Sequence, residues 1–256
     1  MTGTVVFVVL ILVVVGIALM AARSRAAAKQ RQLDDAKADS RRWVERLGGQ
    51  VLNLTGTNEP SRQALADASE RYTAAGSQME QAATAEQCRL VTKTALEGLY
   101  YVRAARGAMG LDLGPDLPVD QEAARAGKVT EDRRVEVEGR DYVASPEPGN
   151  RTPHYYPGGR VAGRPVPQGW YSEPWWKPAL VAGAWGMGSV LLFSMMFAGM
   201  AGIPDGQAWE SGYDAGQADA AADGGGDSGG DAGGGDSGGG DYGGGGDFGG
   251  GGSFDF

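Results

Sequence analysis

Residues 5–22 read VVFVVLILVVVGIALMAA, an apolar run without a single charge. A helix rises about 1.5 Å per residue, so a run of this length nearly crosses the ~30 Å hydrocarbon core of a bilayer. No Lys or Arg precedes it, whereas Arg23, Arg25 and Lys29 follow it. A cleaved signal peptide, the alternative, has its positive charge before the apolar core. The pattern therefore favours an uncleaved transmembrane helix over residues 4–22.

A second uncharged run covers residues 179–203, ALVAGAWGMGSVLLFSMMFAGMAGI. Trp175, Trp176 and Lys177 stand immediately before it, which is typical of an interfacial anchor. The run predicts a second transmembrane helix over residues 178–203, with a buried core helix of a soluble domain as the alternative.

All 23 Lys and Arg residues lie between positions 23 and 177. Because basic segments stay on the cytoplasmic side, we expect a two-pass protein of the cell (plasma) membrane. Residues 23–177 are then cytoplasmic, and the N-terminus and C-terminal tail lie outside. The lipid bilayer is one expected partner. Residues 23–177 are nearly neutral overall, so they lack the net positive charge that is typical of a nucleic-acid-binding segment, and we expect no nucleic-acid partner.

Small residues recur in the second run at the spacing that lets two helix backbones approach closely. Gly186 and Gly188 are the candidate helix-packing positions. Their expected partner is the first run or a second copy of the chain.

Residues 23–110 predict a helical bundle or antiparallel coiled-coil hairpin. Apolar residues recur in steps of three and four in three successive segments. Gly48 and Gly49 are expected to weaken or bend the first helix. Pro60 suits a first helical turn, and Thr84 with Gln87 forms a capping-box pattern.

The stripes of these three helices are rich in Ala, which predicts either a marginal monomeric bundle or one completed by self-association. A helical stripe is most often core, and the alternative is a partner surface. Trp43 and Tyr72 are the residues named for such a surface.

Residues 111–177 predict a linker. The alternation from Arg134 to Val143 fits a small hairpin in which Val135, Val137 and Tyr142 face one another. Residues 145–177 are rich in Pro, Gly and aromatic residues and show no periodicity, so we expect an extended juxtamembrane segment. Its aromatic side chains are expected along the lipid headgroups, with docking to a Pro-recognising partner as the alternative.

Residues 204–256 carry eleven acidic residues, no basic residue and much of the glycine. A low-complexity tail of this composition is expected to be disordered. Its Asp spacing varies between four and six residues, which fits neither a calcium-binding repeat nor an EF-hand loop.

Catalytic motifs are absent. The sequence has one His, His154, in a Pro/Gly-rich segment, and one Cys, Cys88, on an apolar helical stripe. No pair of groups suits acid–base or nucleophilic chemistry. We therefore expect no enzyme activity, no catalytic or metal-binding residues and no cofactor.

Three segments, RRWVERLGGQVLNL, TALEGLYYVRAARGAMGLD and HYYPGGRVAGRPVPQGWYSEPWWKP, together with a Gly-rich acidic tail, resemble an uncharacterised family of two-span membrane proteins of actinobacteria. The resemblance extends over nearly the whole chain. It implies the same topology and supplies no site residues, because the family is described only as a domain of unknown function.

The expected fold class is thus mainly α: two transmembrane helices, a cytoplasmic helical bundle and a disordered Gly/Asp-rich tail. Two functions follow. The first is a non-enzymatic membrane scaffold that holds a protein partner. The alternative is a small oligomeric accessory subunit of a transporter or pore, assembled through Gly186 and Gly188.

Overall fold

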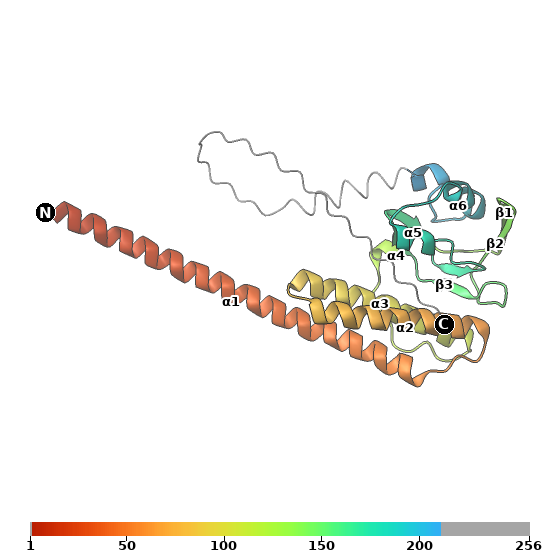
Figure 1. The fold of residues 1–256 in the computed structure, drawn as a ribbon, viewed down its shortest axis with the longest axis horizontal. Helices are drawn as coiled ribbons and strands as arrows, with labels where there is room; N and C mark the ends of the chain where they lie inside the picture. The colour runs from red at the N-terminus through yellow and green to blue at the C-terminus, as the bar shows by residue number, and fades with distance from the viewer. Residues whose placement is uncertain (1, 211–256) are drawn as a thin grey trace, which may run out of the picture.

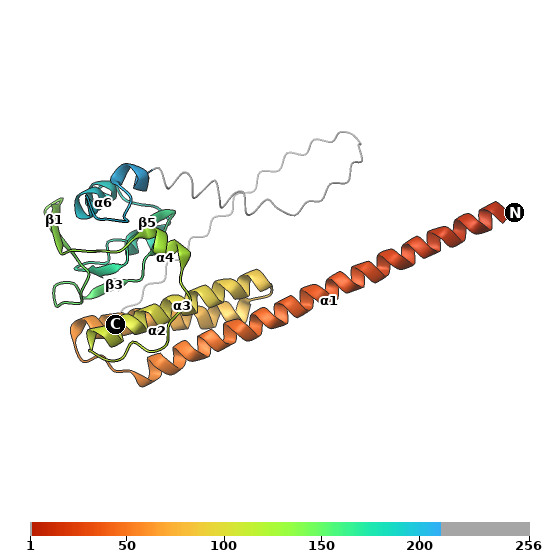
Figure 2. The ribbon, with the colours of Figure 1, turned by 180° about the vertical axis from the view of Figure 1, so that it is seen from behind.

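The computed structural model describes the backbone of residues 2–210 and the side chains of this range except residues 2–9 and 11–14. Three long helices form a bundle, and a small β-sheet with short helices lies against it (Figure 1). The first helix is much longer than the other two, and its N-terminal part extends beyond the bundle (Figure 2).

The bundle consists of α1 (Thr2–Asn53), α2 (Glu59–Gln81) and α3 (Ala85–Ala108). Each of the three contacts the other two. Its core is built mostly of small side chains, which lets the helices pack closely. The fully buried members are Leu47, Ala64, Ala68, Ala75, Cys88, Val91, Ala95 and Ala105. The coiled-coil pairing expected of these helices is not shown.

The starts of α2 and α3 are set by local capping chemistry. The Thr84 hydroxyl accepts from the backbone N–H of Gln87, and the Gln87 side chain accepts from the backbone N–H of Thr84, so the predicted capping box is confirmed. A second box, which sequence analysis did not identify, joins Asn58 and Ser61 at the start of α2. Pro60 lies in the first turn of α2, as expected.

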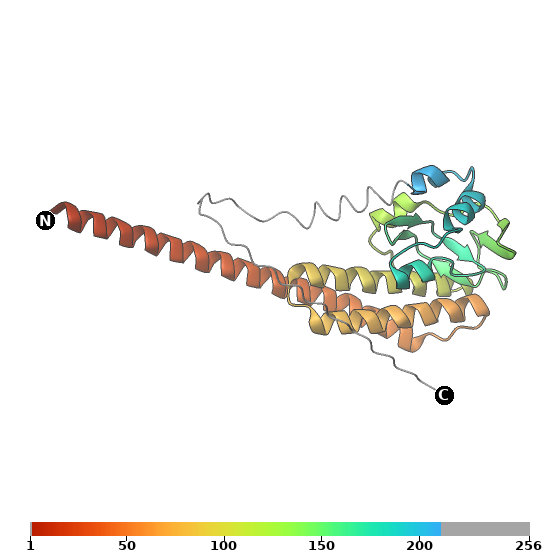
Figure 3. The same ribbon diagram turned by 45° about the horizontal axis from the view of Figure 1, so that its top comes forward.

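The chain after the bundle folds into a β-domain rather than a linker. A four-stranded antiparallel sheet has the order β1-β2-β6-β3, and β4 and β5 form a separate hairpin. The β-domain lies beside the end of the bundle that is farther from the N-terminus (Figure 3). Val135 pairs with Tyr142 in the β1–β2 hairpin. The strands are β1 (Arg133–Val137), β2 (Arg140–Ser145), β3 (His154–Tyr156), β4 (Gly159–Val161), β5 (Arg164–Val166) and β6 (Gly169–Tyr171).

The sheet corrects the expectation for the Pro/Gly-rich segment. Its aromatic side chains form a core instead of lying along lipid headgroups: the Tyr156 ring packs on Trp176 at 4.9 Å, and Tyr171 packs on the same Trp at 5.0 Å. Both tyrosines are buried. The mainly α fold class is therefore wrong, and the described chain combines a helical bundle with a β-sheet.

The second predicted transmembrane helix is also corrected. Residues 178–203 form two short helices, α5 (Lys177–Ala182) and α6 (Ser189–Phe197). Gly183 and Gly188 interrupt the run with φ values of +68° and +81°, which side-chain-bearing residues rarely adopt. The apolar side chains of α6 pack into the β-domain core, where the Phe193 ring stacks on Trp209 at 4.6 Å.

The two-pass architecture is therefore wrong, and the plasma-membrane location and sidedness derived from it are not retained. Within the described part of the chain, no helix has an apolar stretch long enough to cross a bilayer. The first predicted span, residues 4–22, falls mainly on residues whose side chains lie outside that description. The predicted disorder of the tail concerns mostly residues beyond 210, which also lie outside the described residues. Trp209, in contrast, belongs to the β-domain core.

Candidate functional site

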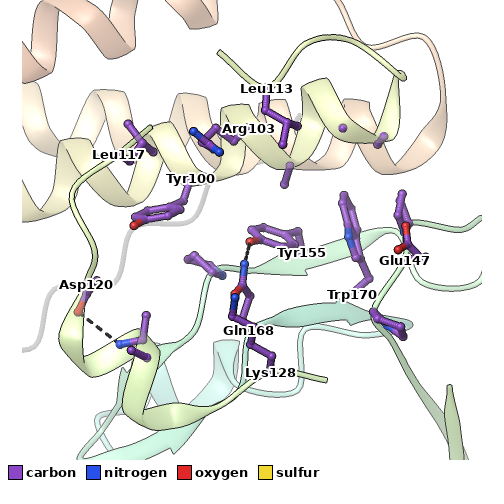
Figure 4. Close-up of a pocket in the computed structure, with 18 of the residues that line it drawn as sticks. Tyr100, Arg103, Leu113, Leu117, Asp120, Lys128, Glu147, Tyr155, Gln168 and Trp170 are labelled. Carbon is purple, nitrogen blue, oxygen red and sulfur yellow. Dashed lines mark hydrogen bonds between the residues drawn. The ribbon is translucent and has the colours of Figure 1, made fainter. Parts of the chain in front are cut away.

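A cavity of about 700 Å³ lies between α3 and the sheet. Side chains from α3, from the loop after it and from β3 and β6 face this space (Figure 4). We call it the α3–sheet cleft. Its size is typical of a binding site rather than of a packing defect.

Helix α3 holds one wall of the cleft in place through its C-terminal part. Gly110, at φ +69°, ends the helix and turns the chain back. Tyr100 Oη then donates to the Pro118 carbonyl at 2.7 Å, and Arg103 Nη1 donates to the Pro115 carbonyl at 2.8 Å. These bonds fix residues 111–120 as a defined wall rather than a free loop.

The opposite wall comes from the sheet. Tyr155 on β3 and Trp170 on β6 are paired across the strands, and their rings lie 5.0 Å apart. Tyr155 also meets Tyr101 of α3 edge to face at 5.9 Å. The aromatic cluster thus joins the sheet to the bundle and forms a rigid floor for the cleft.

Polar groups on the floor are few and fixed. Gln168 Nε2 donates to Tyr155 Oη at 2.6 Å, and the backbone N–H of Gln168 donates to the Gly127 carbonyl at 2.9 Å. Burial raises the pKa of Tyr155 to about 12, and the bond from Gln168 opposes that shift. The Tyr155 hydroxyl is therefore neutral at physiological pH.

Apolar side chains dominate the remaining lining, with charges of both signs among them. Leu113 and Val119 are substantially exposed although they belong to a folded wall. Arg103, Lys128 and Glu147 supply charged groups (Figure 4). The other apolar lining residues are Ala104, Gly107, Ala108, Leu117, Ala123, Ala124, Pro146, Pro148 and Pro157.

The helix α4 (Gln121–Ala126) closes one end of the cleft. Asp120 caps it by accepting from the backbone N–H groups of Glu122 and Ala123 at 2.8 and 3.3 Å. Lys93 of α3 forms an ion pair with Glu122 and so connects α4 to the bundle.

Trp43 and Tyr72, the residues named for a partner surface, lie elsewhere. Both are half-buried and pack against the bundle core. The Tyr72 ring lies against Gly48 of α1. The Arg46 guanidinium lies over the Trp43 ring, with its Cζ atom 5.4 Å from the ring centroid. Their contacts are thus largely internal to the bundle, and neither lines the α3–sheet cleft.

Gly186 and Gly188 lie in the turn between α5 and α6, not within a helix. A Cβ at Gly188 would stand 2.9 Å from Glu138 Oε1 in the β1–β2 turn. The small-residue seam expected of a transmembrane helix is therefore not formed at these positions.

His154 and Cys88 lie in different parts of the fold, on β3 and on α3. Cys88 is fully buried in the bundle. His154 lies half-buried on β3, and its Nδ1 atom has no hydrogen-bond partner within residues 2–210. Among the described residues, no group of three His, Cys, Asp or Glu side chains is arranged to hold a metal ion.

Sequence reasoning missed the cleft residues because they are brought together from three segments of the chain. The only available signal was the pair of aromatic doublets at 155–156 and 170–171, each beside Gly or Pro. Aromatic residues bounded by turn residues are typical of short strands. Each of these strands has only three residues, however, and the alternation of polar and apolar residues cannot be recognised over so short a segment.

Comparison of the chain with protein-family models, curated proteins and solved structures found no match. The resemblance to an actinobacterial two-span family stays a prediction.

Proposed function

We propose that the protein is a non-enzymatic interaction protein whose α3–sheet cleft binds an extended, apolar or proline-rich peptide segment of a partner protein. The observation that supports it best is the floor of fixed rings, Tyr155 and Trp170, below exposed apolar side chains such as Leu113. Aromatic-lined grooves of this kind suit extended segments, which lose little entropy on binding.

The walls of the α3–sheet cleft are held in place by hydrogen bonds within the protein. The wall at residues 111–120 is bonded to α3 through Tyr100 and Arg103, and the floor is hydrogen-bonded through Gln168. A partner segment therefore does not have to order the site, and ordering costs are a main loss in peptide binding. Charges of both signs at the cleft, such as Lys128 and Glu147, suit the polar backbone and flanks of a peptide.

The test is to select peptides on the full chain from a random phage-displayed library and to measure the affinity of a selected synthetic peptide by calorimetry. Leu113→Arg should weaken binding at least about tenfold, because a charge enters an apolar contact. Leu111→Arg is the matched control: Leu111 is 46% exposed and Leu113 45%, but only Leu113 lines the cleft.

Two results would contradict the proposal. One is that no peptide survives selection. The other is that Leu111→Arg and Leu113→Arg weaken the selected peptide equally, which would place its site elsewhere on the chain. The alternative function, a pore or transport accessory, relied on a second membrane span and is not carried further because α5 and α6 replace that span.

A further inference from the structure

A second cavity of about 420 Å³ lies next to the α3–sheet cleft, on the other side of Tyr100 and Val119, which line both. Its walls come from α2, α3, the segment leading into α4, and the β3–β4 turn. This volume is sufficient for a small organic molecule.

One wall carries a guanidinium that is 25% exposed, that of Arg71, with unpaired donors. Arg71 Nε lies 3.2 Å from Glu97 Oε1. Neither Nη atom of Arg71 has a hydrogen-bond partner among the residues that the structure describes. Burial raises the pKa of Glu97, and the nearby positive charges of Arg71 and Lys93 oppose the shift. A guanidinium in this state retains a planar pair of donors for an oxyanion.

Tyr156 adds a third donor to the same wall. Its ring packs on Trp176, and the residue is only 6% exposed. Its hydroxyl has no hydrogen-bond partner within residues 2–210, although it lies in the field of Glu97 and Arg71. Burial raises the pKa of Tyr156, so the hydroxyl stays protonated and can donate. Because Tyr156 lines the cavity, this hydroxyl can donate to a ligand that enters it.

The remaining wall combines apolar side chains with charges of both signs, among them the acidic residues Asp120 and Glu122. Leu96 and Pro157 contribute buried or half-buried carbon surface, and Leu180 of α5 is partly exposed. Arg160 from β4 and Lys93 from α3 also line the cavity, Lys93 in an ion pair with Glu122.

We propose that this cavity binds a small amphipathic carboxylate, its carboxylate accepting from Arg71 and Tyr156 and its hydrocarbon body lying on Leu96 and Pro157. The ligand would supply the acceptor that the three donors lack, and its apolar part would cover the carbon wall. This inference goes beyond the proposed function and does not depend on it, because the two donors, Arg71 and Tyr156, line this cavity and not the α3–sheet cleft.

The test uses octanoate and 1-octanol as a matched pair of probes on the ¹⁵N-labelled full chain. The amide signals of Gly158 and Gly159, which line the cavity, report local binding and so distinguish it from adsorption on exposed apolar residues of α1. Octanoate should shift both signals in a saturable manner, with an affinity at least about tenfold higher than that of octanol.

Tyr156→Phe removes only the hydroxyl, so the fold is retained, and octanoate should bind about five- to tenfold more weakly while octanol is unaffected. Arg71→Gln should lose at least about tenfold for octanoate. Arg62→Gln, on the exposed face of the same helix, is the control and should bind as the wild type does. Equal affinities for the two probes, or octanoate binding unchanged in both Tyr156→Phe and Arg71→Gln, would overturn the proposal.

Discussion

The ring of Tyr72 on α2 lies so close to Gly48 on α1 that a Cβ added at Gly48 would stand 2.7 Å from Tyr72 Cε2. Gly48 is thus the position that lets α1 and α2 approach. The neighbouring Gly49 has nothing within 4 Å of its Cβ direction. Two adjacent glycines in one helix therefore have opposite structural roles.

In Gly48→Ala, relieving the clash with Tyr72 requires the ring or the helix to move, which costs about 1–3 kcal/mol. The helix-propensity gain of about 1 kcal/mol offsets part of this, so the protein should be destabilised by up to about 2 kcal/mol. Gly49→Ala should instead stabilise by about 0.5–1 kcal/mol. The measurement is the free energy of unfolding from urea titrations.

A double-mutant cycle identifies the cause. In a Tyr72→Ala background, Gly48→Ala should become neutral or stabilising, since the ring that it meets is gone. If Gly48→Ala and Gly49→Ala change stability in the same direction, the close approach of α1 and α2 is not what Gly48 provides.

The bundle was the more predictable half of the fold, because its signals are local. The capping pattern of Thr84 and Gln87 involves residues three apart and is formed as expected. Gly48 and Gly49, expected to weaken or bend α1, do not end it, because the helix continues to Asn53; whether they weaken or bend it stays a prediction. Propensity counts only the cost of a glycine within its own helix, whereas packing against Tyr72 supplies its tertiary reason.

The β-domain was not predictable from the same signals. An apolar run such as residues 179–203 has the same composition whether lipid or protein surrounds it. Here Trp175 and Trp176 face Phe197 and Tyr171 and not a bilayer interface. The α3–sheet cleft depends on strand pairings across long sequence separations, such as Ser145 with Trp170, which no local pattern encodes.

A lysine–aspartate pair joins the β-domain to the bundle. Lys177 Nζ lies 3.1 Å from Asp67 Oδ1, and the Asp67 side chain is only 9% exposed. Lys177→Met should cost about 1–2 kcal/mol of stability, because Asp67 loses the cation beside it and keeps the weaker bond from the Gln63 amide. Unfolding free energies from denaturant titrations measure the loss.

Arg62→Met is the matched control for that substitution. Its pair with Glu59 is more than half exposed on both sides, so its loss should cost less than about 0.5 kcal/mol. Adding Asp67→Asn to Lys177→Met should recover much of the lost stability, since the uncompensated charge is removed. A Lys177→Met variant as stable as Arg62→Met would show that the contact contributes little.

Cys88 should react only when the bundle opens. It is fully buried between the helices, so a maleimide can reach the thiol only through unfolding. Labelling in native buffer should be at least about a thousandfold slower than in denaturant, as expected for a domain stable by ~5 kcal/mol. Mass spectrometry over time measures the rate. Labelling in native buffer at a rate close to the denatured one would mean that the bundle is open in solution.

His154 should make the protein less stable in mild acid. Burial lowers its pKa from the ordinary value of 6.5; Lys177 adds to the shift, and Asp67, Glu173 and Glu59 oppose it. The unfolded chain therefore binds a proton at a higher pH than the folded chain does. The stability contribution is present above about pH 6.5 and is lost as the pH falls toward the folded pKa.

The measurement compares the wild type with His154→Gln, which cannot titrate, by urea unfolding at several pH values. Glu97 titrates in both proteins, and because burial raises its pKa its own contribution is lost as the pH rises through the folded value. Subtracting the two curves removes that opposing slope. The wild type should lose stability relative to His154→Gln as the pH drops below about 6.5. A difference that stays constant with pH would mean that the His154 ring is solvated in the folded state.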